Sequence, residues 1–181
     1  MRPLQPTSLA RRRALQHLMA GTAVLGVSGC GFALRQAPTF AFESVRIAGS
    51  ENTPVASALG SALRVNGLQV VTSATPTPPE GAAPAQVVLT VITDQRERLA
   101  VGQTAAGQVR ELQLRTRFTF RLRTPNEKEL IGDTELLLER DLSFSETAVL
   151  SKDAEEALLY RDMASDVVQQ VVRRLAAVKS L

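Results

Sequence analysis

The sequence predicts an α+β domain with two helices packed on one face of a mostly antiparallel sheet of four to five strands. Residues 109–123 alternate strictly between apolar and polar side chains, which is typical of an antiparallel sheet with one buried and one solvated face. Residues 151–179 carry an apolar stripe at helical spacing, and cap residues delimit a shorter helix near 53–67. The expected order is β-α-β-β-β-α, with the last three strands as a meander.

The N-terminal segment has the features of a secretory signal. Three arginines at 11–13 precede an apolar stretch at about 18–27, which is too short to span a bilayer. The run Val27-Ser28-Gly29-Cys30 resembles a bacterial lipobox and ends at the only cysteine. This resemblance implies lipid attachment, palmitate included, at Cys30; the alternative is an ordinary secreted protein with a chance cysteine. We therefore expect a signal peptide at 1–29, a lipid-anchored tether at 30–39 and a single domain at 40–181.

Removal of the signal peptide changes the charge of the chain. The whole sequence carries a net charge of +3, but residues 1–29 hold four arginines and no acid, which leaves 17 basic and 18 acidic residues. The high isoelectric point is thus no argument for nucleic acid, and we expect no nucleic-acid partner. The arginine triplet also faintly resembles a twin-arginine signal, which leaves the export route open.

The expected mature chain lacks the residues that most catalytic sites use. Its one histidine, His17, leaves with the signal peptide, so a Ser-His-Asp or Cys-His arrangement is excluded. No P-loop or dinucleotide-binding motif occurs, and we expect no cofactor, no metal and no enzymatic activity. A carboxylate pair and the neighbours Ser151 and Lys152 remain formal alternatives, but serine before a helix is usually a cap.

The first half of the domain follows from its alternation and its cap residues. Residues 42–48 alternate as a strand, and Thr53-Pro54 begins a helix with Thr53 as N-cap. Asn66-Gly67 ends this helix, and 68–72 form a short second strand. A proline-rich loop at 73–84 leads into the third strand, 85–98, on which Val87, Leu89 and Val91 share a face.

The second half has clearer patterns. On the fourth strand, 109–123, the side chains expected to face the core are those of Leu112, Leu114, Thr116, Phe118, Phe120 and Leu122. The fifth strand, 129–144, turns its leucines inward and its acids outward, namely Asp133, Glu135, Glu139 and Asp141. The last helix, 151–179, is about 40 Å long. Its apolar stripe, which we expect in the core rather than on a membrane or partner, is Leu159, Met163, Val167, Val171 and Leu175.

Four segments of the chain resemble the LPS-assembly lipoprotein family, LptE. The run Cys30-Gly31-Phe32-Ala33-Leu34-Arg35 is similar to the CGFxLR start of its mature members. The other three segments are 63–67, 107–112 and 151–156, the last leading into a final helix that ends at 173–175. The resemblance covers nearly the whole mature chain. It implies an outer-membrane lipoprotein on the periplasmic side that plugs and helps assemble the LptD β-barrel, binds lipopolysaccharide and takes part in its insertion into the outer leaflet.

The resemblance and the topology both direct attention to basic residues at one end of the sheet. Lys152 matches a lysine through which family members are thought to bind lipopolysaccharide, whereas a second basic position of some members is Ala106 or its neighbours here. In a meander, the turn after the third strand and the exit from the fifth lie at the same end. We therefore expect a lipopolysaccharide site of Lys152, Arg96, Arg98 and Arg110, since arginine and lysine suit lipid A phosphates. Solvated loop charge, partly neutralised by nearby acids, is the alternative.

Two further interpretations concern the arginines of the fourth strand and the functional class of the protein. The stripe Arg115, Arg117, Arg121 and Arg123 is expected to pair with the acids of the fifth strand, or to make a polar contact with a barrel wall, rather than bind ligand. The alternative function is an auxiliary lipoprotein of an ABC-type lipid transporter, and a lipid-anchored hydrolase is disfavoured. Gly31 after the cysteine, where aspartate would favour inner-membrane retention, favours the outer membrane.

Overall fold

The computed structural model describes residues 37–75, 84–144 and 149–181, so Cys30 and the expected signal peptide lie outside the described residues. The elements follow the order β1 (Ser44–Gly49), α2 (Pro54–Val65), β2 (Gln69–Val71), β3 (Val87–Gln103), β4 (Val109–Arg123), β5 (Glu129–Ser143) and α3 (Val149–Ala176). The observed order is β-α-β-β-β-β-α, which contains all five strands predicted along the chain. The predicted order β-α-β-β-β-α lists one strand too few, because the short β2 is a strand of its own that pairs with β1.

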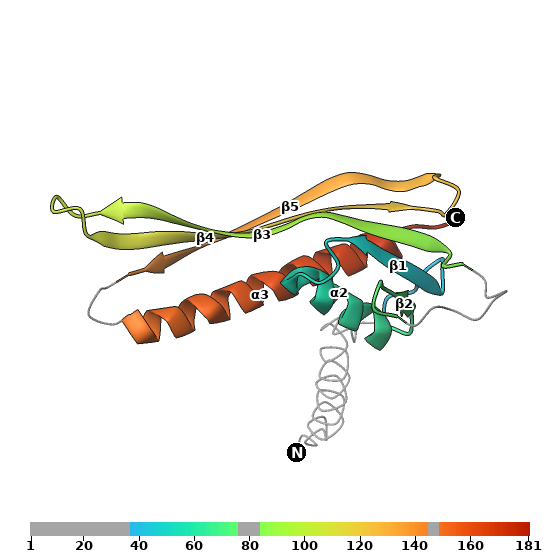
Figure 1. Cartoon of the computed structure of the whole chain (residues 1–181), viewed down its shortest axis with the longest axis horizontal. Coiled ribbons are helices and arrows are strands. Elements are labelled where there is room, and N and C mark those ends of the chain that lie inside the picture. The colour runs from blue at the N-terminus through green and yellow to red at the C-terminus, as the bar shows by residue number, and fades with distance from the viewer. Residues whose placement is uncertain (1–36, 76–83, 145–148) are drawn as a thin grey trace, which may run out of the picture. The chain divides into compact units, whose positions relative to one another are not determined.

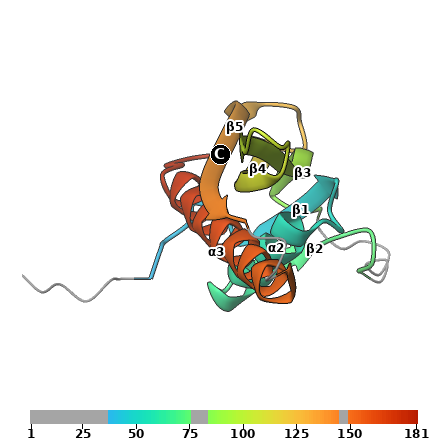
Figure 2. The ribbon, with the colours of Figure 1, turned by 90° about the vertical axis from the view of Figure 1, so that its left-hand side faces the viewer.

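The five strands form one mixed sheet in the order β2-β1-β3-β4-β5. β1 pairs in parallel with both β2 and β3, whereas β3, β4 and β5 form the expected antiparallel meander. The parallel pairing of β1 with β2 arises because α2 serves as a crossover between these two strands. Both helices cover the same face of the sheet (Figure 1), and the end-on view shows the strands as a curved layer beside them (Figure 2). The α+β class with two helices on one face is confirmed, and the sheet is more mixed than expected.

The apolar core lies between the sheet and the two helices. Phe118 and Phe120 are fully buried on β4 and share one cluster with Val167, Val171 and Leu175 of the α3 stripe, as expected. A second, smaller cluster joins the far half of β4 to α3 through Leu114, Tyr160 and neighbours. Neither helix of the described residues combines the length and the apolar character needed to cross a membrane.

A bulge in β3 decides which side chains of this strand face the helices. Val91 pairs with Phe120, and Thr93 pairs with the adjacent Thr119, so Ile92 is the extra residue. Such an insertion reverses the alternation of the strand beyond it. Asp94, Arg96 and Arg98 therefore lie opposite the inward-facing Phe118, Thr116 and Leu114, respectively. Without the bulge, the alternation set by Val87, Leu89 and Val91 would place these charged residues on the outer face.

The start of α2 shows one consequence of this bulge. Thr53 occupies the N-cap position, but its hydroxyl donates to the Ser50 carbonyl at 2.7 Å and does not cap the helix. Asp94 takes that role, because its Oδ2 accepts hydrogen bonds from the backbone N–H groups of Val55 (2.9 Å) and Ala56 (3.2 Å). The predicted N-cap position of Thr53 is therefore confirmed, but the side chain that accepts the first N–H groups is Asp94 of β3 and not Thr53.

The other helix boundaries follow the sequence more closely. Gly67 has φ 88° and its N–H donates to the Arg64 carbonyl, while the N–H of Leu68 donates to the Leu63 carbonyl. This pair of bonds is a Schellman motif, which confirms Asn66-Gly67 as the end of α2. α3 begins at Val149, so Ser151 lies inside its first turn and is not the cap.

Candidate functional site

One end of the sheet gathers Lys152 and Arg110, as the topology predicted. The turn between β3 and β4, the end of β5 and the start of α3 all lie at this end (Figure 1). The N–H of Phe144 donates to the Arg110 carbonyl at 2.8 Å, and Lys152 Nζ lies 3.2 Å from Ser143 Oγ. We call this region, with Arg98, the tip.

Acidic side chains of α3 partly neutralise the tip. Lys152 Nζ lies 2.8 Å from Glu155 Oε2, and its side chain is only 19% exposed. Arg98 Nε lies 3.2 Å from Glu156 Oε2, and its guanidinium lies over the Phe144 ring at 5.6 Å. Arg110 forms no ion pair with any residue that the structure describes. The acids that neutralise the tip are thus Glu155 and Glu156 of α3, whereas the sequence suggested Glu97 and Glu111 beside the turn between β3 and β4. Glu97 pairs instead with Arg117 on the outer face.

Arg96 lies apart from the tip. It lies six positions along β3 from Gly102, which pairs with Glu111 and so lies at the level of Ser143. This separation corresponds to about 20 Å of extended chain. The four cations therefore do not form one cluster. Arg96 instead faces the helices and lies over the ring of Tyr160, with 5.1 Å between the guanidinium carbon and the ring centroid.

Tyr160 is held firmly beside Arg96. Its side chain is buried, and its hydroxyl donates to the Glu97 carbonyl at 2.7 Å. Burial raises the pKa of the Tyr160 phenol, the negative charge of Glu156 adds to this effect, and Arg96 and Arg98 oppose it. The phenol thus stays protonated and keeps its hydrogen bond at neutral pH.

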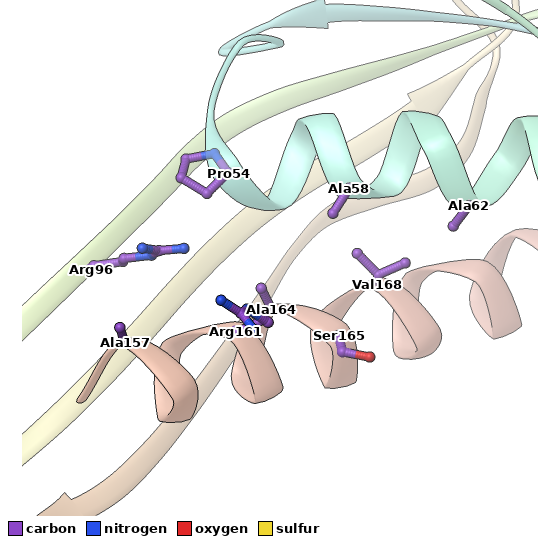
Figure 3. Close-up of a pocket in the computed structure, with 9 residues that line it drawn as sticks. All are labelled: Pro54, Ala58, Ala62, Arg96, Ala157, Arg161, Ala164, Ser165 and Val168. Atoms are coloured by element: carbon purple, nitrogen blue, oxygen red, sulfur yellow. The ribbon is translucent and has the colours of Figure 1, made fainter. Parts of the chain in front are cut away.

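A groove of about 600 Å³ runs between α2 and α3. Figure 3 shows Arg96, Arg161, Pro54 and Ala157 toward one end of it, whereas the other end is lined by small or apolar side chains. The lining residues are Pro54, Ala58, Ala62, Arg96, Ala157, Arg161, Ala164, Ser165 and Val168. No pattern in the sequence predicted this groove, because it depends on how two helices distant in the chain pack together.

The outer face of the sheet carries a ladder of paired charges. The pairs are Arg115–Glu139 (2.7 Å), Arg117–Glu135 (2.7 Å), Arg117–Glu97 (3.3 Å), Arg121–Asp133 (3.6 Å) and Arg123–Glu127 (2.9 Å). Hydrogen bonds to Glu135 and then Glu97 raise the pKa of Arg117. The predicted cross-strand pairing is confirmed. These pairs are largely solvated, so each contributes little to stability.

The described residues contain no group of three or more histidine, cysteine, aspartate or glutamate side chains arranged to bind a metal ion. The polar and charged side chains of the tip and the groove are therefore the candidates for ligand contact. Their chemistry suits anions, because arginine and lysine supply N–H donors and positive charge.

Comparison with known proteins gives a consistent family signal. The family described as "LptE: Lipopolysaccharide-assembly" matches residues 42–175. Lipoprotein B from Nitrosomonas europaea is 31% identical, with a TM-score of 0.65, over 81% of this chain and 91% of that one. No curated protein matches the sequence.

Two further solved structures support the fold alone. The rare lipoprotein B from Shewanella oneidensis is 23% identical, with a TM-score of 0.58, over 74% of this chain and 94% of that one. A minor lipoprotein from Acinetobacter baumannii is 20% identical, with a TM-score of 0.57, over 77% of this chain and 94% of that one.

Proposed function

Because this chain belongs to the LptE family of lipopolysaccharide-assembly proteins, we propose that it plugs the LptD β-barrel, assists its assembly and takes part in lipopolysaccharide insertion into the outer leaflet. The observation that carries the proposal is the family match over residues 42–175, which includes every strand and all but the last residue of α3. A subunit with this role acts by binding and assembly, without catalysing a reaction.

The proposed location is the periplasmic side of the outer membrane. The lipobox ending at Cys30 and Gly31 after it support cleavage of residues 1–29 and lipid attachment to Cys30. The tether 30–39 would then hold the domain 40–181 at the membrane. The similar proteins from Nitrosomonas, Shewanella and Acinetobacter are themselves named lipoproteins, which agrees with this proposal.

The tip is the proposed contact for lipopolysaccharide. Arg110 has no carboxylate partner among the described residues, and Lys152 and Arg98 can exchange their carboxylate partners for phosphate oxygens. Arg96, expected at the same site, supports it only if the ligand extends about 20 Å along β3. Exposed charges are screened within about 8 Å at physiological ionic strength, so this binding should weaken as salt rises.

The outer face supports a contact with the barrel. Its arginines and acids neutralise one another across β3, β4 and β5, as in Arg115–Glu139 and Arg117–Glu135. A surface whose charges are already paired can face a polar wall when the contact keeps bridging water, because its charged groups then remain solvated. The proposal therefore places this face, and not the tip, against the wall of the barrel.

A pull-down from detergent-solubilised outer membranes tests the partner. The full chain should co-purify with a very large outer-membrane β-barrel in a stable complex. Recovery of an inner-membrane ATPase instead would support the alternative, an auxiliary lipoprotein of an ABC-type lipid transporter, and would overturn the proposal.

Neutralisation of Lys152 tests the ligand site. Lys152→Gln is preferable to a charge reversal, because glutamate at this position would repel Glu155 one turn along the helix. Lys152→Gln should weaken lipopolysaccharide binding, whereas the matched Arg121→Gln on the outer face should leave it nearly intact. The opposite result would place the ligand site along the sheet face.

A further inference from the structure

The groove between α2 and α3 combines an apolar lining with a basic end. Its apolar part is built by Ala58 and Ala62 of α2 and by Ala164 and Val168 of α3 (Figure 3). These short side chains leave a volume of about 600 Å³, which lies within the range of pockets that hold small ligands. Ala164 and Val168 are already largely buried and form the floor of the groove, so an apolar chain would mainly remove the exposed Ala58 and the half-buried Ala62 from water.

The basic end presents two arginines from different elements. Arg96 comes from β3 and Arg161 from α3, and both lie toward the end of the groove near Pro54 (Figure 3). Within the described part of the chain neither forms an ion pair, whereas Arg98 has a carboxylate at 3.2 Å. Their donors are therefore open to a ligand.

Packing fixes the position of Arg96 before any ligand arrives. Its guanidinium lies over the Tyr160 ring, and the Tyr160 hydroxyl is bonded to the Glu97 carbonyl at 2.7 Å. A cation held by an aromatic face loses less freedom when it binds an anion. The groove therefore has one preorganised arginine and one exposed arginine, Arg161.

Among the described residues, no acid lies within ion-pair range of Arg96 or Arg161. Asp94 Oδ2 is bonded to the first N–H groups of α2, and Glu156 is bonded to Arg98. Asp153 and Glu156 line an adjoining shallow hollow with Arg96, yet neither is within ion-pair distance of it. The two guanidinium groups thus keep their positive charge unpaired at this end of the groove.

We propose that this groove is a binding site for a phosphorylated amphiphile. Arg96 and Arg161 bind the phosphate, and the alanine-lined part between the helices takes an alkyl chain. A phosphate dianion suits two guanidinium groups that approach from separate elements, and each can donate two parallel N–H bonds. The proposal does not rest on the function proposed above, because Lys152 and Arg110 take no part in the site.

Calorimetric titration with dodecyl phosphate, below its micelle concentration, tests the site. The expected mature chain, residues 30–181 with Cys30→Ala, is used, so that neither an attached acyl chain nor the apolar signal segment competes for the groove. Dodecyl phosphate should bind at least about tenfold more tightly than inorganic phosphate or the uncharged dodecyl maltoside, because only it engages both parts of the groove. Equal affinity for inorganic phosphate, or for dodecyl maltoside, would overturn the proposal.

Matched variants locate the binding. Arg161→Ala should weaken dodecyl phosphate binding about tenfold, whereas Arg173→Ala, an exposed arginine of the same helix outside the groove, should have no effect. Ala58→Leu should fill the apolar part and weaken binding, while Ser61→Leu on an exposed position of α2 should not. Equal losses in a variant and its control would refute the assignment.

One competitor and one variant separate this site from other interpretations. A polyglutamate peptide should not displace dodecyl phosphate; complete displacement would identify a docking site for acidic protein segments and refute the proposal. Lys152→Gln should leave dodecyl phosphate binding unchanged. Loss of lipopolysaccharide binding at the tip and loss of dodecyl phosphate binding in the groove are therefore measured in different variants.

Discussion

Removal of the Asp94 carboxylate should destabilise the domain more than removal of the Thr53 hydroxyl. In the structure, Asp94 Oδ2 accepts the N–H groups of Val55 and Ala56 at 2.9 and 3.2 Å, whereas Thr53 donates to the Ser50 carbonyl. Asp94→Ala leaves two helix N–H groups without an acceptor. Thr53→Ala leaves both of these bonds in place.

The magnitudes follow from the number and kind of bonds. Loss of an N-cap acceptor costs about 0.5–2 kcal/mol, and loss of the negative charge at the helix N-terminus adds about 0.3–1 kcal/mol. Asp94 Oδ1 is buried without a partner in the described residues, so its removal returns part of this cost. We expect a loss of about 2 kcal/mol for Asp94→Ala and about 0.5 kcal/mol for Asp94→Asn, which keeps an acceptor. Thr53→Ala should cost less than about 1 kcal/mol.

Urea denaturation followed by far-ultraviolet circular dichroism measures these differences, since the chain has no tryptophan to report unfolding. All four proteins should have the same m value, so that the shifts of the midpoint report stability alone. A Thr53→Ala loss equal to or larger than that of Asp94→Ala would show that the cap is local and that the bulge does not place Asp94 at the helix.

Three further predictions concern the core, the tyrosine and the anchor. Phe118→Ala or Phe120→Ala should cost about 3–5 kcal/mol in urea denaturation, and a loss below about 1 kcal/mol at both would mean that neither is a core residue. Because burial raises the pKa of Tyr160 in the folded state, the folded state holds the phenol proton more tightly than the unfolded state. The contribution of this group to folding stability should be complete below about pH 10 and should decline as pH rises through the folded pKa. Tyr160→Phe should abolish this alkaline decline and cost about 1 kcal/mol at neutral pH; phenolate absorption reports Tyr160 directly, since it is the only tyrosine, and titration at an ordinary pKa would contradict the burial. Cys30→Ala should leave the precursor uncut or mislocalised, and mass spectrometry that finds an unmodified Cys30 in the mature wild-type protein would disprove lipidation.

Periodic patterns predicted the elements that bury one face. Strict alternation placed Phe118 and Phe120 in the core, and both are fully buried. The i+4 spacing of α3 likewise identified Met163 and Val167 as core residues. These predictions succeed because burial of one face imposes a period on the sequence itself. The Asn66-Gly67 helix end was also predictable, because glycine readily adopts the positive φ that this motif requires.

Sequence patterns were thus sufficient to predict the α+β class, the buried faces of β4 and α3, and the charge ladder of the outer face. The parallel position of β1 and the side of the sheet that β3 side chains face beyond Ile92 could be seen only in the folded chain. No local pattern marks the Ile92 bulge, because a bulge is defined by the register of the partner strand. That single extra residue turns Asp94 toward α2 and Arg96 toward α3, where packing of two distant helices brings Arg96 into a shared groove with Arg161.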